Sequence, residues 1–263
     1  MNDPFPAIAE ASATGETADL FADIRATVGV RVVNLVWRHL AMLDGALPWA
    51  WAAVKPLYLD GLAEQAAQRF RETMIVPKLA SLAGDAPASV DAVLASYDHS
   101  NTINLFALGA LVSWLGGEAG GAPPLPLGLR LKAPDVVLPV LASEADVTPE
   151  TWALVRRLNR FGDTAQPLIL ASMYRHLAHA PAFLRRVEAA LVPVQADGSL
   201  DRAIAANRTV AHEAAKHLAQ SISTQRPPLA DKIETSVSAF IDHAIGKMVT
   251  ICRAIRVARG TPL

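Results

Sequence analysis

The sequence predicts an all-α protein built from two tandem helical repeats, and three observations lead to this prediction. Hydrophobic residues make up 52% of the 263-residue chain while aromatic residues make up only 6%, and the alanine- and leucine-rich remainder favours helices over strands. Hydrophobic side chains recur with helical spacing, and we find no convincing run of alternating strand residues. Finally, segments 37–61 and 174–198 carry nearly the same sequence.

The two similar segments align without a gap, and ten of their 25 paired positions are identical. Trp37 aligns with Tyr174 at one end, and the pairs Asp60-Gly61 and Asp197-Gly198 align at the other. This match exceeds what an alanine-rich composition gives by chance, so it indicates a duplicated unit. Duplication predicts a pseudo-twofold molecule, and clefts at the seam between such halves often bind ligands.

This interpretation divides the chain into four parts that form one compact, pseudo-dimeric domain. They are an N-terminal arm (1–16), a first helical repeat (17–116), a proline- and glycine-rich linker (117–147) and a second helical repeat (148–263).

In the first repeat, helical patterning begins near Thr17, Pro48 suits the first turn of a helix, and Asp60-Gly61 breaks the pattern. The helices expected in order are 17–28, 32–43, 48–59, a long helix after Gly61 that ends near Leu82, one that begins at Pro87, and a very apolar one from Asn101 to Leu115.

The segment from Gly116 to Val147 holds two Gly-Gly pairs and five prolines, a density that no helix or sheet interior tolerates. We expect a partly extended connector that packs through Leu125, Leu127, Leu129 and Leu131. Thr148-Pro149-Glu150 is then a strong helix start, with threonine at the cap and proline in the first turn. The helices expected after it are 148–160, 168–180, 182–195, 199–221 and 230–259.

Charge and composition exclude several classes of protein. The net charge of −1 creates no global field that would attract nucleic acid or an anionic membrane, and we interpret Arg253, Arg256 and Arg259 as cations that complement a helix C-terminus. The single cysteine, Cys252, excludes an internal disulfide. No signal peptide is recognised, and the longest apolar stretch is too short to span a bilayer. We therefore expect a soluble cytoplasmic protein.

Histidine spacing does not favour a metal site. His212 and His217 are five residues apart, whereas the zinc-protease pattern needs four, and Lys216 occupies the required place. His176 and His179 share a spacing of three, but no third ligand stands at a defined distance from them. We expect neither a metal nor another cofactor.

Several stretches together resemble one family of helical enzymes. They are Ala50-Trp51-Ala52-Ala53-Val54-Lys55-Pro56, the segment from Tyr97 through Asn101 to Leu105, and Ala171-Ser172-Met173-Tyr174-Arg175. Their order and spacing, from about residue 18 to 258, resemble the DL-2-haloacid dehalogenases, also catalogued as halocarboxylic acid dehydrogenases. The duplication fits as well, since that family consists of two helical repeats that form a pseudo-dimer.

The resemblance implies a reaction and an assembly. The family hydrolyses the carbon–halogen bond of short 2-haloalkanoic acids, so the implied partner is a small carboxylic acid. An aspartate deprotonates water, which attacks C2 directly and inverts it, while an asparagine helps to hold the water. The implied assembly is a homodimer.

Residue by residue, the polar part of the family's site is retained and its base is not. The family's asparagine falls on Asn101, and the serine before the catalytic aspartate falls on Ser172. The aspartate itself falls on Met173, which cannot accept a proton, and Tyr174 follows it.

The aromatic surroundings of the family's pocket also differ. The pocket tryptophan and phenylalanine fall on Val32 and Leu35, and a pocket tyrosine falls near Asp242. A carboxylate at Asp242 could act as base from the opposite wall, and Asp98, Asp163 and His176 are further candidates.

Two hypotheses follow. In the first, the protein binds a small carboxylic acid at the seam and hydrolyses it, if at all, with a relocated base. In the second, it is a non-catalytic binding or assembly protein that kept the scaffold, and Asn101 only caps a helix. A cavity lined by an ionisable group would favour the first hypothesis, whereas a seam plugged by Met173 would favour the second.

Overall fold

The computed structural model describes residues 5–118, 128, 133–163 and 168–261, and within these residues it contains helices and no strands. The α-helical prediction is therefore confirmed. The helices are α1 Gly15–Val28, α2 Leu35–Leu40, α3 Ala46–Leu59, α4 Leu62–Thr73, α5 Ala88–Leu115, α6 Pro149–Leu158, α7 Ser172–Leu177, α8 Pro181–Ala196, α9 Ser199–Ala219, α10 Ala230–Ala239 and α11 Gly246–Ala258, with 3₁₀ turns η1 Glu10–Ser12 and η2 Glu144–Asp146 and a π-helical turn η3 Phe240–Ile245.

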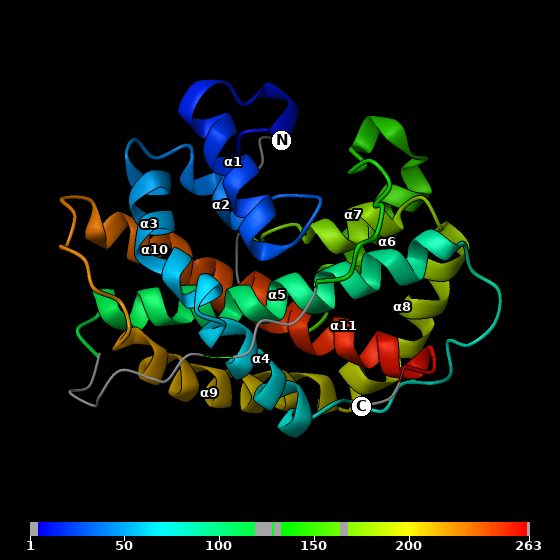
Figure 1. Ribbon diagram of the computed structural model, residues 1–263. Helices are drawn as coiled ribbons and strands as arrows, with labels where there is room; N and C mark the ends of the chain where they lie inside the picture. Colours follow the sequence, from blue (N-terminus) through cyan, green and yellow to red (C-terminus); the bar gives the residue numbers. More distant parts are fainter. Residues whose placement is uncertain (1–4, 119–127, 129–132, 164–167, 262–263) are drawn as a thin grey trace.

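Helix α5 is the centre of the molecule. It crosses the middle of the fold and packs against α3, α4, α7, α9, α10, η3 and α11 (Figure 1). Helices α1 to α3 lie at one end of the molecule and α6 to α8 at the other. Most side chains of α5 are buried on every face, including the largely polar run from Ser96 to Asn104 in its middle.

Two separate hydrophobic clusters fill the interior. The first joins α1 to α4 with the C-terminal part of α5, with α10 and with η3. The second joins α6 to α8 with the N-terminal part of α5 and with α11. The long helix α5 and the run from α10 to α11 thus each pass from one core to the other.

The segments of the sequence repeat occupy matching places in their local structure. Trp37 in α2 and Tyr174 in α7 are both fully buried. Gly61 and Gly198 precede α4 and α9 with φ of +71° and +72°, a left-handed conformation that glycine adopts without strain. These parallels are what a duplication predicts. A pseudo-twofold relation between complete halves, with the boundaries given above, stays a prediction.

Helix ends in the first half differ from the sequence-based expectation. α2 covers only Leu35–Leu40 of the expected 32–43, because the Val33 amide bonds to Glu10 Oε1 at 2.8 Å in extended backbone before the helix begins. α4 ends at Thr73 and not near Leu82. Asn207 of α9 holds both backbone groups of Ile75, each at 2.8 Å, and so takes them out of the helix.

The two helices expected at Pro87 and at Asn101 are one continuous helix, α5. Asn101 does not cap a helix start. Its side chain instead accepts a hydrogen bond from Asn34, which lies just before α2, and neighbouring polar side chains bond back within α5, as Thr102 does to the Asp98 carbonyl at 2.6 Å. A local cap signal was therefore misread because its tertiary partner is distant in sequence.

In the second half, the helix expected over 168–180 begins only at Ser172. Asn159 donates to the Ile169 carbonyl at 3.0 Å and accepts from the Ala171 amide at 2.9 Å, which holds that segment out of the helix. The helix expected over 230–259 contains the π-helical turn η3. The π-helical turn η3 ends at Gly246. A Cβ atom at this position would lie 2.5 Å from the Ile241 carbonyl oxygen, so the close approach requires glycine.

The four linker leucines expected to pack against the halves, at 125, 127, 129 and 131, lie outside the described residues. Among the residues that are described, no helix is both long enough and apolar enough to span a membrane.

Candidate functional site

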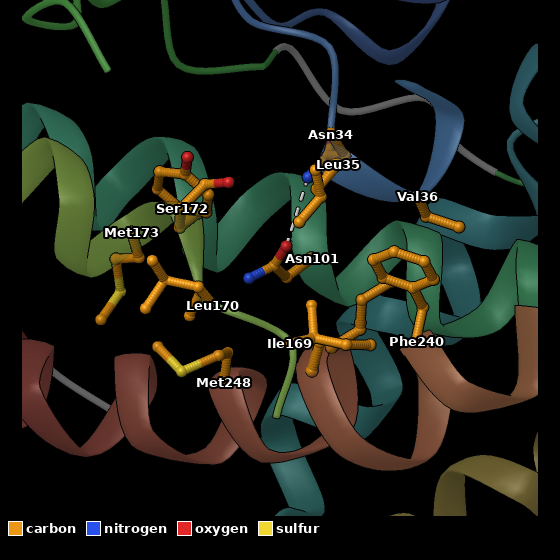
Figure 2. Close-up of a pocket in the computed structure, with 14 residues that line it drawn as sticks. Asn34, Leu35, Val36, Asn101, Ile169, Leu170, Ser172, Met173, Phe240 and Met248 are labelled. Atoms are coloured by element: carbon orange, nitrogen blue, oxygen red, sulfur yellow. Dashed lines mark hydrogen bonds between the residues drawn. The ribbon is translucent and has the colours of Figure 1, made fainter. Parts of the chain in front are cut away.

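A small pocket lies where the two hydrophobic cores meet. Its volume is about 40 Å³, counted as space for the centre of a water-sized sphere. Since one water needs about 10–15 Å³ by this measure, the pocket holds about three waters, or a ligand of a few heavy atoms. It is lined by Asn34, Leu35, Val36, Tyr97, Asn101, Ile169, Leu170, Ala171, Ser172, Met173, Phe240, Ala244, Ile245 and Met248 (Figure 2).

A buried network of amides fixes the orientation of Asn101. The oxygen Oδ1 of Asn101 accepts from Asn34 Nδ2 at 3.2 Å, and Asn34 Oδ1 accepts from Asn104 Nδ2 at 3.1 Å. Asn104 Oδ1 in turn accepts from Trp37 Nε1 at 3.1 Å and from the Tyr58 hydroxyl at 2.7 Å. Both of the last two groups can only donate to this oxygen, so the direction of the whole chain of bonds is set.

The consequence is that Asn101 turns a donor toward the pocket. Its oxygen is occupied by Asn34, and Figure 2 shows its amide nitrogen turned away from Asn34, to the side where Leu170 and Met173 lie. Asn101 is only 7% exposed, so a hydrogen bond from this nitrogen to a ligand would form in a water-poor environment.

A second polar chain approaches the pocket from α5 and α7. The Tyr97 hydroxyl lies 3.0 Å from Nδ1 of His176, and both side chains are buried. Ser172 Oγ is near enough to the Tyr97 hydroxyl to favour its ionised form, although the pair lacks the geometry of a full hydrogen bond. Burial dominates and raises the pKa of Tyr97 well above its usual value.

The rest of the pocket wall is apolar. Met173 and Met248 are 1% and 2% exposed, and Leu35, Ile169 and Phe240 contribute further hydrocarbon (Figure 2). Such a wall excludes water and strengthens the polar contacts that remain. Thioether sulfurs are also polarisable, and they suit contact with a large, soft atom.

None of the described lining residues carries a carboxylate, an ammonium, a guanidinium or an imidazole group. Asp98 pairs with Arg256 and, at 3.5 Å, with Arg253, which holds α5 against α11. Asp163 pairs with Lys247 and with His243, each at 3.2 Å. Both carboxylates therefore serve ion pairs away from the pocket.

The structure brings four of the sequence-predicted site residues together and leaves three apart. Asn101, Leu35, Ser172 and Met173 line one pocket. Val32, Tyr174 and Asp242 are not among its lining residues. Successive residues of a helix point about 100° apart, so Tyr174 turns into the second core while Met173 faces the pocket. Asp242 is partly exposed on η3, whose Phe240, Ala244 and Ile245 line the pocket instead.

Sequence reasoning missed Asn34 and the role of Tyr97. Asn34 lies just outside the duplicated segment, and Tyr97 was seen only as part of a motif. The available signal was the spacing of Tyr97, Asn101 and Asn104 along α5, which places them near one face at intervals of four and three residues. Among the described residues, no group of three His, Cys, Asp or Glu side chains is arranged to hold a metal ion.

Comparisons with known proteins indicate one group of similar enzymes. No protein-family model matches the chain. A configuration-inverting 2-haloacid dehalogenase of Alcaligenes xylosoxydans xylosoxydans is 27% identical over 244 residues, which are 86% of this chain and 81% of that protein. A configuration-inverting 2-haloacid dehalogenase of Pseudomonas sp. (strain 113) is 30% identical over 135 residues, which are 44% of this chain and 42% of that protein.

The chain is therefore similar in sequence to 2-haloacid dehalogenases over most of its length. Solved structures of D-2-haloacid dehalogenase share its fold. A mutant in complex with D-2-CPA superposes with a TM-score of 0.73 at 16% identity, over 97% of this chain and 96% of that one. A complex with L-LA superposes with a TM-score of 0.74 at 17% identity over the same shares. At these identities the structures show a shared fold alone.

Proposed function

We propose that this protein binds a small carboxylic acid in the pocket between the two cores and hydrolyses 2-haloacids slowly or not at all. The single observation that carries the proposal is the pocket wall itself, which keeps Asn101 and Ser172 as donors but has Met173 in the place where the family resemblance puts the base. A retained binding site and a missing carboxylate give binding without fast chemistry.

The size and polarity of the pocket support a small ligand. Room for about three waters suits an acid of roughly three carbons. The Asn101 amide nitrogen and the Ser172 hydroxyl are donors for carboxylate oxygens, and the methionine-lined wall suits an alkyl group or a halogen. Ser172 Oγ is buried and makes no hydrogen bond of good geometry with the described residues, so it is available to a ligand.

The proposal predicts weak hydrolysis because a positioned general base typically contributes about 10²–10⁴-fold to the rate. Without a carboxylate in the wall, water near Asn101 has no strong acceptor for its proton. Hydrolysis of 2-chloropropionate should then fall far below that of a relative with an aspartate at this position.

A non-catalytic binding or assembly protein is the second candidate. The observation that favours it is the burial of Met173, which fills part of the seam with hydrocarbon. Under this alternative neither enantiomer of a short acid would bind measurably, and the fold would serve another partner.

Two measurements on the purified protein test the proposal. Isothermal titration with propionate and with both enantiomers of 2-chloropropionate should give saturable binding, and halide release from the chloro acid should be slow. The variant Asn101→Ala should bind about 10-fold or more weakly, since a hydrogen bond to a charged group is worth about 1.5–3 kcal/mol.

Lys78→Ala serves as a matched control, because it removes an exposed cation that does not line the pocket and should leave binding unchanged. Failure of all three acids to bind, or equal binding by Asn101→Ala, would contradict the proposal. Rapid halide release would contradict its kinetic part.

A further inference from the structure

The pocket lacks a carboxylate, so any proton taken from a bound water must go to another group. Asp98 and Asp163 are held by cations away from the pocket, and Asp242 is not in its wall. His176 is the remaining candidate from the sequence. His176 does not line the pocket either. Its ring contacts Tyr97, however, and Tyr97 does line the pocket.

The contact between these two residues has the geometry of a proton-transfer route. The Tyr97 oxygen lies 3.0 Å from His176 Nδ1, and the ring centroids are 5.7 Å apart. His176 is 1% exposed, and its Nε2 has no hydrogen-bond partner among the described residues. A tyrosine hydroxyl can donate and accept at once, so it can receive a proton on one side as it gives its own on the other.

We propose that Tyr97 and His176 form a relay that replaces the missing carboxylate as the proton acceptor of this pocket. The relay rests on the proposed function, because it acts on a haloacid and a water bound in the same pocket. Tyr97 touches the reacting water, and His176 acts through Tyr97.

The water oxygen forms a bond to C2 of the acid as the carbon–halogen bond breaks, and the halide leaves with the electron pair of that bond. One water proton passes to the Tyr97 oxygen while the Tyr97 proton passes to His176 Nδ1. The products are the 2-hydroxy acid, halide and an imidazolium ion, which returns its proton to solvent after the products leave.

The electrostatics make this a weak but usable base. Burial and the cations Arg175, His179 and Arg38 lower the pKa of His176 to about 4, so its ring is neutral at pH 7. That pKa is close to the ordinary value of an aspartate, about 3.9, but His176 does not line the pocket and receives the proton only through Tyr97, so the relay is slower than a carboxylate in the wall. Burial keeps the Tyr97 hydroxyl protonated, so Tyr97 does not act as a tyrosinate base. It can accept a proton from water only as it gives its own proton to His176.

The experiment compares wild type with Tyr97→Phe and His176→Gln, using 2-chloropropionate for halide release and propionate for calorimetric binding. Both substitutions nearly conserve volume. Glutamine is the sharper variant, because its amide oxygen can accept the Tyr97 hydrogen bond but cannot take the proton. We expect kcat to fall roughly 10²-fold in both variants, the lower end of what a general base contributes, with KM and propionate affinity within threefold of wild type.

Circular dichroism and thermal melting establish that both variants are folded, and the exposed His217→Gln is the matched control that should keep the wild-type rate. Full activity of His176→Gln or Tyr97→Phe would overturn the relay. Propionate binding by a wild type that releases no halide above the uncatalysed rate would also overturn it, while the proposed binding function would stand. Absence of propionate binding would overturn both.

Discussion

At the scale of single residues, Met173 occupies the position in the pocket wall where the family resemblance puts the base. It is 1% exposed and faces Asn101 across a space in which the described wall has no charge. The neighbours that would accompany a carboxylate there are also changed, since the position that resemblance assigns to an aromatic ring is Leu35. The family resemblance thus places both the base and an aromatic ring at positions where this pocket has aliphatic side chains.

This context predicts that Met173→Asp restores at most a trace of hydrolysis. In so dry a site burial raises the pKa of the new carboxyl, so it stays protonated and cannot accept a proton from water. Halide release from 2-chloropropionate by Met173→Asp should stay within about 10-fold of that by Met173→Asn, which has the same shape without the acid. A gain of 10² or more at pH 7 would contradict this account of the wall.

His176 predicts a specific pH dependence of stability. The pKa of His176 is lowered from its ordinary value of 6.5, which applies to the unfolded chain, to about 4 in the folded protein. Between these values the unfolded chain binds more protons than the folded one, so stability falls as pH drops through this window. At 1.36 kcal/mol per pKa unit, wild type should lose about 2–3 kcal/mol more between pH 7 and pH 4.5 than His176→Gln does.

Urea unfolding of the two proteins at both pH values measures this difference. His217→Gln, in which an exposed histidine is replaced, should follow wild type. Parallel pH profiles for wild type and His176→Gln would show that the imidazole ionises as easily in the folded protein as in the unfolded chain.

At the scale of elements, side chains that bond to distant backbone decide where helices end. Asn207 stops α4 at Thr73, and Asn159 delays α7 to Ser172. Two arginines near the C-terminus also form contacts between elements that are distant in sequence. Arg256 of α11 forms an ion pair with Asp98 of α5. Arg259, at the C-terminal end of α11, forms one with Asp91 of α5. These ion pairs act in addition to any effect of the arginines on the dipole of their own helix.

The ion pair of Lys247 with Asp163 predicts an asymmetric pair of mutations. Lys247 is fully buried, and it also donates to the Asn159 carbonyl at 2.6 Å. Asp163→Asn should cost about 3–5 kcal/mol, because it leaves a buried ammonium without its counter-charge, whereas Lys247→Met should be tolerated far better. The ion pair connects α11 with the segment that follows α6, so its removal should weaken the packing of both.

Denaturant unfolding of the single variants and of the double variant measures the coupling. The double variant should recover most of the stability lost by Asp163→Asn alone. Equal and additive losses in the two single variants would contradict a desolvated ion pair.

At the scale of the whole molecule, the family resemblance predicts a homodimer. Large hydrophobic side chains remain exposed on this chain, among them Val137 and Val140, which are 80% and 82% exposed. Light scattering at tens of micromolar protein should give twice the chain mass of 27.9 kDa. A particle of the single-chain mass over this range would contradict the prediction.

The sequence by itself determined the fold class, most helix positions and half of the pocket. Helical periodicity and the Asp-Gly and Thr-Pro signals act locally, so they can be read from neighbouring residues. The motif resemblance grouped Asn101, Ser172 and Met173, and all three line one pocket, while their roles in it stay a prediction.

Only the tertiary structure decided which groups act on that pocket. Asn34 orients Asn101 across 67 residues of sequence and is itself held by Asn104 across 70, and Tyr97 reaches His176 across 79. It also decided that Asp242 lies outside the wall, since its direction depends on the π-helical turn at η3. Hydrogen-bond partners and side-chain directions are set by how helices cross, and no periodicity along the chain encodes that crossing.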